Sequence, residues 1–298
     1  MYTAKIQNAQ GEILQLNDQE NKWAVLSITG LNPAPAQLSM SEIYGMDGSR
    51  MNYAKLTARN IVIMLRLCGD VEQNRLEIYH YFPQKAPVRF FYKTRTRDVY
   101  IDGYVETIEG DLYTQNEVFQ ISLICPDPFF RSADEFVVEL QNSRGEFTFP
   151  FAIDQNDPVE FGSYSGARTT EVINDTQTET PIEITIMARE QLSVFTWFVV
   201  QNQLTGEKIG FSGWPIAHDE GFMPGDVIYI NTDPAHPTMQ LLIGNTVYNK
   251  IPNMIPGGSF FQLHPGENVF AYKTYPSGYD MDNKVDVTMT FRKLYRGV

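Results

Sequence analysis

The sequence contains few of the residues that build disulfide frameworks or metal sites. Its 298 residues include two cysteines, Cys68 and Cys125, and four histidines, none with a second histidine or a cysteine at ligand spacing. A disulfide scaffold or a zinc site requires more of these side chains, placed closer together. We therefore expect two buried free thiols, no metal and no cofactor. The histidines are His80, His218, His236 and His264.

Long apolar runs and excess positive charge are also absent. No stretch of about 18 apolar residues occurs, so we expect no membrane-spanning helix. The segment Met1–Lys5 does not begin a basic stretch followed by an apolar run, so we expect no signal peptide and synthesis in a cytoplasm. The net charge is -13. Such an acidic chain repels phosphate backbones, which argues against general nucleic-acid binding.

The sequence has no complete catalytic motif. Gly210–Trp214 resembles a nucleophile elbow, but Trp214 stands where that motif needs glycine, and we interpret the segment as a loop. No glycine run is followed by the Lys-Ser or Lys-Thr of a phosphate loop. Asp280–Asn283 lacks the glycine and the distal glutamate of a calcium loop. Paired carboxylates remain a formal alternative, as in a glycosidase. We expect no enzyme and no catalytic, cofactor-binding or metal-binding residue.

The residues that are abundant favour strands. Aromatic residues make up 13% of the chain, and apolar and polar side chains alternate with period two, which is typical of half-buried strands. The segment Val118–Cys125 is apolar on both faces and is expected to be a central strand. The other alternating segments are 60–67, 99–105, 182–188 and 285–291. The sequence therefore predicts a mainly β fold.

One segment has helical character. Asp70 can cap a helix over Glu72–Phe82, and Pro83 ends the run. Leu76, Tyr79 and Phe82 fall at helical spacing and are expected on its apolar face.

Turn residues divide the β pattern. Gly244-Asn245 predicts a two-residue hairpin turn, and the prolines of Pro126–Pro128 end the strand before them. That segment marks the expected boundary between an N-terminal domain, residues 1–133, and a C-terminal domain, residues 134–298. Asp154–Gly166 and Pro276–Lys284 are expected to be loops.

Two groups of residues are candidates for binding. Lys93, Arg95 and Arg97 would share one face of a continuous strand and contact an acidic partner or a nucleic acid passing nearby; alternatively, residues 94–98 form a solvated hairpin tip. Three tryptophans would supply a sugar-stacking platform if exposed, although large aromatic residues of β domains more often lie in the core. The tryptophans are Trp23, Trp197 and Trp214.

The order of several short motifs carries a resemblance that no single motif does. In the first half the motifs are Asp47-Gly48, Arg59-Asn60-Ile61, Asn74-Arg75 with Tyr79 and Phe82-Pro83, Ile101–Glu106, and Ile124–Phe130. In the second half they are Thr180-Pro181, Pro224–Asp226, Ile230–Thr232, Gly244-Asn245, Leu263 with Pro265–Asn268, and Tyr295–Val298. In this order they resemble the distal tail proteins of long-tailed, non-contractile bacteriophages, over nearly the whole chain.

The resemblance implies a fold and a role. It implies a β-rich N-terminal domain with one short helix that forms a hexameric ring, and a C-terminal galectin-like β-sandwich. The ring would be a structural hub of the phage tail tip, in the virion at the distal end of the tail. Its partners would be other copies of the chain, the major tail tube protein, a tail-associated protein and, in some viruses, receptor-binding or baseplate proteins. DNA would cross its channel only as cargo.

A second hypothesis belongs to another functional class. In this hypothesis the C-terminal sandwich binds carbohydrate of the host cell wall; the fold alone does not establish sugar binding, because one fold hosts unrelated functions. Exposed Trp or Tyr beside convergent Asn, Asp or Arg side chains would support that hypothesis.

Overall fold

The computed structural model describes residues 2–17, 22–111, 117–140, 143–144, 163–164, 169–192, 197–212, 221–275 and 284–298. The described chain is mainly β with one α-helix, as the period-two alternation predicts. It forms two compact units. Unit 1 contains Met1–Asp134 and Lys293–Val298, and unit 2 contains Glu135–Arg292. Residues 293–298 thus belong to unit 1, whereas the division made from the sequence places them in the second domain.

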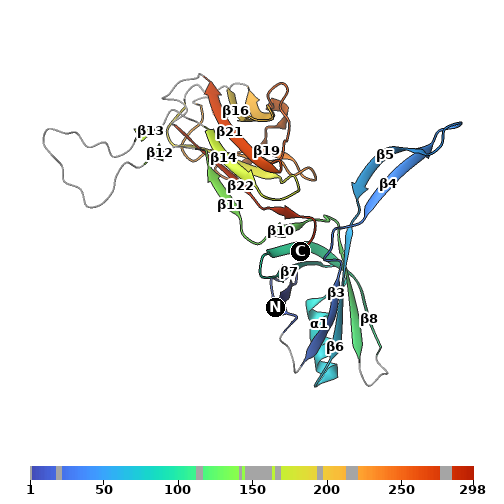
Figure 1. Cartoon of the computed structure of the whole chain (residues 1–298). Coiled ribbons are helices and arrows are strands. Elements are labelled where there is room, and N and C mark those ends of the chain that lie inside the picture. Colours follow the sequence, from blue (N-terminus) through green and yellow to red (C-terminus); the bar gives the residue numbers. More distant parts are fainter. Residues whose placement is uncertain are drawn as a thin grey trace. The chain divides into compact units, whose positions relative to one another are not determined.

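Unit 1 is built on one large antiparallel sheet (Figure 1). Its strands follow the order β2-β1-β7-β8-β9-β6-β3, and β10 joins β8 and β23. Strand β9 lies between β8 and β6, which confirms the central strand predicted from its two apolar faces. The strands of this sheet are β1 (Thr3–Gln7), β2 (Ile13–Gln15), β3 (Trp23–Thr29), β6 (Arg59–Leu67), β7 (Pro87–Lys93), β8 (Asp98–Gly110), β9 (Val118–Cys125), β10 (Phe130–Ser132) and β23 (Leu294–Tyr295). Strands β4 (Ala36–Glu42) and β5 (Ser49–Leu56) form a separate two-stranded sheet.

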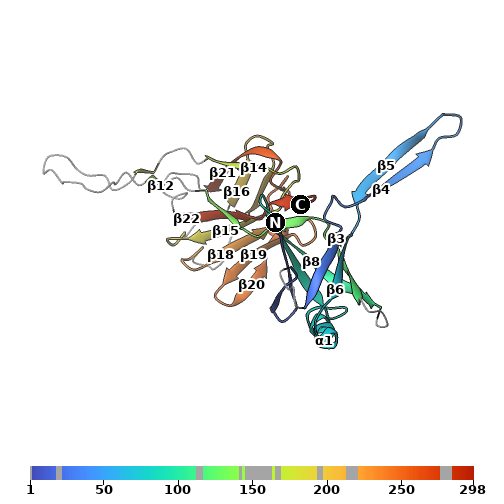
Figure 2. The same ribbon diagram turned by 60° about the horizontal axis from the view of Figure 1, so that its bottom comes forward.

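Helix α1 (Val71–Tyr81) lies beside β6 and covers the core of unit 1 (Figures 1 and 2). The side chain of Asp70 accepts a hydrogen bond from the backbone N–H of Gln73, so the predicted cap is confirmed. Phe82 is buried as expected, but the prediction for Leu76 and Tyr79 is wrong: their exposed fractions are 54% and 42%. The helix instead buries Ile78 and Asn74. The side-chain amide of Asn74 donates hydrogen bonds to two main-chain carbonyls next to the sheet.

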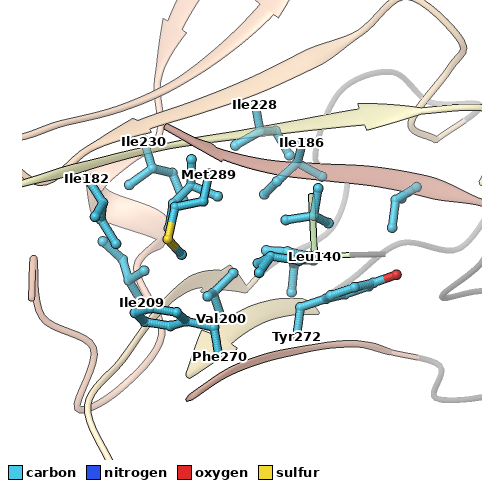
Figure 3. Packing of buried hydrophobic residues seen from close by; sticks show 14 of the residues in the cluster. Leu140, Ile182, Ile186, Val200, Ile209, Ile228, Ile230, Phe270, Tyr272 and Met289 are labelled. Carbon is cyan, nitrogen blue, oxygen red and sulfur yellow. The ribbon is translucent and has the colours of Figure 1, made fainter. Parts of the chain in front are cut away.

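Unit 2 has two antiparallel sheets on either side of one apolar core (Figure 3). The six-stranded sheet has the order β11-β22-β15-β18-β19-β20, and the four-stranded sheet has the order β14-β21-β16-β17. A two-stranded pair, β12 with β13, completes the described strands. The elements are β11 (Phe136–Glu139), β12 (Ser143–Arg144), β13 (Ser163–Tyr164), β14 (Thr169–Asn174), β15 (Ile182–Ala188), β16 (Trp197–Asn202), β17 (Lys208–Ser212), β18 (Val227–Asn231), β19 (Thr238–Ile243), β20 (Thr246–Asn249), the 3-10 turn η1 (Ile251–Asn253), β21 (Gly266–Tyr275) and β22 (Val285–Phe291).

Alternation decides which side chains enter this core. Ile182 and Ile186 of the six-stranded sheet face Val200 and Phe270 of the four-stranded sheet, and all four are fully buried. The hairpin β19–β20 turns at Gly244, which has a φ of +55°, so the predicted hairpin is confirmed. These features give unit 2 the layered arrangement of a β-sandwich.

Two of the predicted loops cannot be compared with the structure, and the predicted loop at Gly210–Trp214 is partly wrong. The expected loops 154–166 and 276–284 lie outside the described residues, apart from β13 and Lys284. The interpretation of Gly210–Trp214 as a loop is wrong for its first three residues, which belong to β17. Gly210 permits that strand because a Cβ there would meet the carbonyl oxygen of Phe198 at 2.0 Å.

Candidate assembly surface

Strands β4 and β5 form a long hairpin, here called the arm, that extends beyond the sheet of unit 1 (Figures 1 and 2). Its two faces are defined by side-chain contacts. The Ser49 hydroxyl lies 3.4 Å from the sulfur of Met40, so both side chains share one face. Asn52 contacts Ser41 at 3.2 Å and Ser39 at 3.5 Å, which places these three residues on the opposite face.

The face that contains Met40 is open and mostly apolar, with Glu42 and Ser49 at its end near the tip. Cross-strand neighbours share a face, and the register pairs Ala36 with Leu56, Leu38 with Ala54, and Met40 with Met51. The exposed fractions of Leu38, Met40 and Met51 are 52%, 59% and 55%. The opposite face is polar and also carries Gln37, Arg50, Tyr53 and Lys55. The arm is therefore an amphipathic hairpin whose apolar face no described part of unit 1 covers.

The tip of the arm has the same character. Tyr44 is fully exposed, and Ile43 and Met46 have exposed fractions of 43% and 67%. Gly45 and Gly48 have φ values of +82° and +90°, which shape the turn, and a Cβ on either would meet nothing within 4 Å. Exposed hydrophobic side chains therefore lie both on the apolar face and at the tip, with the pair Glu42 and Ser49 between them.

The exposed hydrophobic side chains of the arm have a physical consequence. A two-stranded hairpin alone is marginally stable in water, and a contiguous exposed apolar patch on a protein marks an interaction site. Burying one Leu or Met side chain contributes about 1.5–3 kcal/mol. The arm is the strongest candidate for a functional surface in the described chain, and its chemistry suits another protein.

The root of the arm, which comprises residues 30–35 and Thr57, is fixed to unit 1 by hydrogen bonds and close packing. The backbone N–H of Thr57 donates to the carbonyl of Pro35 at 3.0 Å and closes the base of the hairpin. Gly30, with φ +82°, packs so closely on β6 that a Cβ would meet the Asn60 oxygen at 2.0 Å. Arg59, at the start of β6, donates to the carbonyls of Gly30 and Asn32.

Sequence reasoning does not find the arm. The only residues of the arm that enter the prediction are Asp47-Gly48, which form part of the family resemblance. The signal that identifies it is the alternation of Leu38 and Met40 before the turn with Met51 after it, between Pro35 and Arg59.

The predicted basic cluster is a turn and not a strand face. Lys93 ends β7 and its Nζ lies 2.5 Å from Oδ2 of Asp98, which begins β8. The N–H of Thr94 donates to the carbonyl of Arg97 at 2.7 Å. The alternative of a hairpin tip at residues 94–98 is therefore confirmed.

The histidines form separate local contacts. His80 lies 2.7 Å from Glu12, and His264 contacts Glu179 at 3.2 Å and Glu207 at 2.5 Å. The backbone N–H of His236 donates to the carbonyl of Asp233 in a turn, and His218 is outside the described residues. In the part of the chain that the structure describes, no three His, Cys, Asp or Glu side chains form a group suited to a metal ion.

Two carboxylates beside histidines have shifted pKa values. Hydrogen bonds from Asn8 and His80 lower the pKa of Glu12. Burial raises the pKa of Glu207, but hydrogen bonds from His264 and Thr205 outweigh that effect and leave the pKa below its ordinary value. The first contact joins α1 to the segment between β1 and β2, and the second joins the segment between β16 and β17 to the one before β21.

The tryptophans form no common platform in the described residues. Trp23 is buried in the core of unit 1 and its Nε1 donates to the carbonyl of Leu16. Trp197 is half-buried on β16, and Trp214 lies outside the described residues. The core interpretation is thus confirmed for Trp23.

The two cysteines are free. Cys125 is buried, and burial raises the pKa of its thiol to about 12. Cys68 is half-buried, which differs from the expectation of two buried thiols. No helix in the described ranges is both long and apolar enough to cross a membrane.

Comparison with solved structures identifies the fold over the full length. The Dit protein of phage SPP1, described as a paradigm of the hub adsorption apparatus of phages that infect Gram-positive bacteria, matches with a TM-score of 0.67. The alignment covers 99% of both chains at 13% identity. The chain has the fold of SPP1 Dit.

Chains of two phage P2 baseplate structures have a related arrangement. The baseplate in its activated conformation with Ca matches with a TM-score of 0.51 at 15% identity, and the one with Sr with a TM-score of 0.52 at 14% identity. Both alignments cover 100% of each chain. No protein-family model matches the sequence. No curated protein matches it either.

Proposed function

We propose that the chain is a structural hub protein of a phage tail, whose copies join head to tail into a six-membered ring at the distal end of the tail tube. The full-length similarity to SPP1 Dit, together with the exposed apolar arm, carries this proposal. Six is the copy number implied by the sequence resemblance. The proposal needs no catalytic group, since the work of such a protein is assembly.

The arm supplies the contact that a ring requires. A ring closes when one surface of each copy meets a different surface of its neighbour. No described part of unit 1 covers the apolar face of the arm, so a second copy is the occupant we assign to it. When a second copy covers the arm, its Leu and Met side chains are buried, whereas they are exposed in the isolated chain.

The same proposal names the neighbours of the ring. They are the major tail tube protein on one side, a tail-associated protein on the other, and receptor-binding or baseplate proteins around it. DNA passes through the ring as cargo. The net charge of -13 suits a channel that does not retain DNA.

Light scattering across a concentration series, with negative-stain images of the same sample, tests this function. The expected result is a species near six times 34.0 kDa that appears as a six-fold ring with an open centre. A monomer at every concentration, with and without the tail tube protein, would overturn the ring. In that case no assembly would support the assignment of the arm as the contact between copies.

A further inference from the structure

Arg59 is a buried cation whose hydrogen-bond acceptors are main-chain carbonyls. The residue is 1% exposed. Its Nε donates to the carbonyl of Pro128 at 2.8 Å, Nη2 donates to that of Arg296 at 2.6 Å, and Nη1 donates to those of Gly30 and Asn32. Its guanidinium also lies over the ring of Phe130, 4.6 Å from the centroid. One side chain thus joins three distant stretches of the chain.

These three stretches have distinct places in the fold. Gly30 and Asn32 lie in the root of the arm, between β3 and β4. Pro128 lies between β9 and β10. Arg296 belongs to the segment Leu294–Val298, here called the closing segment, which follows unit 2 in the chain and lies in unit 1.

The closing segment makes further contacts with the same root. The N–H of Val298 donates to the carbonyl of Leu31 at 3.1 Å. A Cβ on Gly297 would meet the Leu31 oxygen at 3.0 Å and the ring of Pro33 at 3.1 Å. The segment and the root are therefore in direct packing contact, and Gly297 leaves no spare room between them.

A second arginine holds the closing segment from the other side. Nη1 of Arg97 donates to the carbonyl of Gly297 at 3.1 Å, and its guanidinium lies 4.3 Å from the centre of the Tyr295 ring. Tyr295 also pairs with Phe130 through β10 and β23. The segment is thus fixed independently of the arm, which allows it to act as an anchor.

The chemistry of Arg59 suits this junction. A guanidinium presents five N–H donors in a rigid planar fork, whereas a lysine ammonium presents three donors around one point. Four carbonyls from three stretches can be satisfied together only by the wider fork. Removing the fork leaves buried carbonyls without donors, and that loss falls on the root of the arm.

We propose that Arg59 and the closing segment form a clasp that fixes the direction of the arm, so that the arm is ready for assembly only after residues 294–298 have docked. This inference rests on the proposed ring function for its consequence, but not for its geometry. Arg59 and Arg296 are 237 residues apart. At about 5–20 residues per second, synthesis separates them by roughly 10–50 s. During that time the arm would lack its clasp, which delays ring formation until unit 2 has also been made.

The direction of the arm can be measured on the full chain by pulsed electron-paramagnetic-resonance distances. Spin labels are placed on Tyr44→Cys at the arm tip and on Glu72→Cys in α1, with Cys68→Ser in the background. Buried Cys125 stays unlabelled. The measurement is made at a concentration where the chain is monomeric. The variants to compare are a chain that ends at Lys293, and Arg59→Lys with Arg66→Lys as its control. Arg66 lies on the same strand but is exposed.

The clasp predicts a narrow distance distribution for the parent chain and for Arg66→Lys. It predicts a distribution at least twofold broader for Arg59→Lys and for the chain ending at Lys293, with the circular dichroism of the sheet retained. Equal widths in all four chains would overturn the clasp. If the shortened chain does not fold, the comparison of the two lysine variants decides the question alone.

Ring formation gives the second readout. The chain ending at Lys293 and Arg59→Lys are expected to form rings at least tenfold less well than the parent at equal concentration. Rings formed equally well by all variants would overturn the link between clasp and assembly. A parent chain that never forms rings would instead contradict the proposed function, while the distance measurement would still test the clasp.

Discussion

The hydroxyl of Ser49 and the sulfur of Met40 are 3.4 Å apart across the arm, so the two side chains lie on one face. Ser41, which directly follows Met40 in β4, contacts Asn52 on the other face. Adjacent positions of one strand therefore point in opposite directions from a hairpin that has no core of its own. This arrangement allows the role of the apolar face to be tested against a control one residue away.

The first prediction concerns that face. Met40→Asp is expected to weaken association at each contact by about 10- to 150-fold, because burying a Met contributes about 1.5–3 kcal/mol. Ser41→Asp adds the same charge on the polar face and is expected to assemble normally. The measurement is the ring fraction by light scattering at equal concentrations. Equal loss in both variants would show that charge on the arm, and not its apolar face, governs assembly.

The second prediction concerns the core of unit 2. Ile184 is fully buried in β15, so Ile184→Ala is expected to lower the free energy of unfolding by about 2–5 kcal/mol. Thr185→Ala changes the outward face of the same strand and is expected to cost less than about 0.5 kcal/mol. Denaturant unfolding followed by tryptophan fluorescence measures both. A similar cost for both changes would contradict the described inward and outward faces.

The third prediction concerns pH. The folded pKa of Glu207 lies below its ordinary value of 4.5, so its stabilising contribution is fully present above that value and is lost as the pH falls through the lowered pKa. Glu207→Gln is expected to reduce the dependence of stability on pH in this acidic range. The exposed Glu267→Gln is the control. Thermal unfolding between pH 3 and pH 6 measures the effect, and identical slopes in parent and Glu207→Gln would contradict it.

The fourth prediction concerns the thiols. Burial raises the pKa of Cys125 to about 12, so almost no thiolate forms there at pH 8. Cys68 is half-buried and is expected to react. Titration with a disulfide reagent should therefore find one reactive thiol in the folded chain and two after denaturation. The variant Cys68→Ser should remove the native signal, and a retained signal would place the reactive thiol elsewhere.

The sequence predicts local features of this fold well. Period-two alternation identifies β6, β8, β15 and β22, because the side chains of a strand with one buried face must alternate. Asp70 and Pro83 bound the helix through local chemistry. The spacing of apolar residues predicts the wrong buried face for that helix. The core contains the polar side chain of Asn74, whose amide is hydrogen-bonded, where the prediction expects an apolar residue.

The assembly surface is harder to predict. The alternation of Leu38 and Met40 is the same whether the apolar face meets a core or a partner, so only the three-dimensional structure shows that the face is open. The role of Arg59 depends on carbonyls at positions 30, 32, 128 and 296. No pattern along the chain relates positions so far apart, and carbonyls carry no side-chain identity.

Hydrogen–deuterium exchange of the arm, in assembled and in monomeric chain, tests the central claim most directly. If a second copy covers the arm, the backbone amides of β4 and β5 should exchange at least tenfold more slowly in the assembly than in the monomer. The amides of β15 in unit 2 serve as the internal reference and should exchange at one rate in both. Arm amides that exchange equally fast in the two states would contradict the assignment of the arm as the contact between copies.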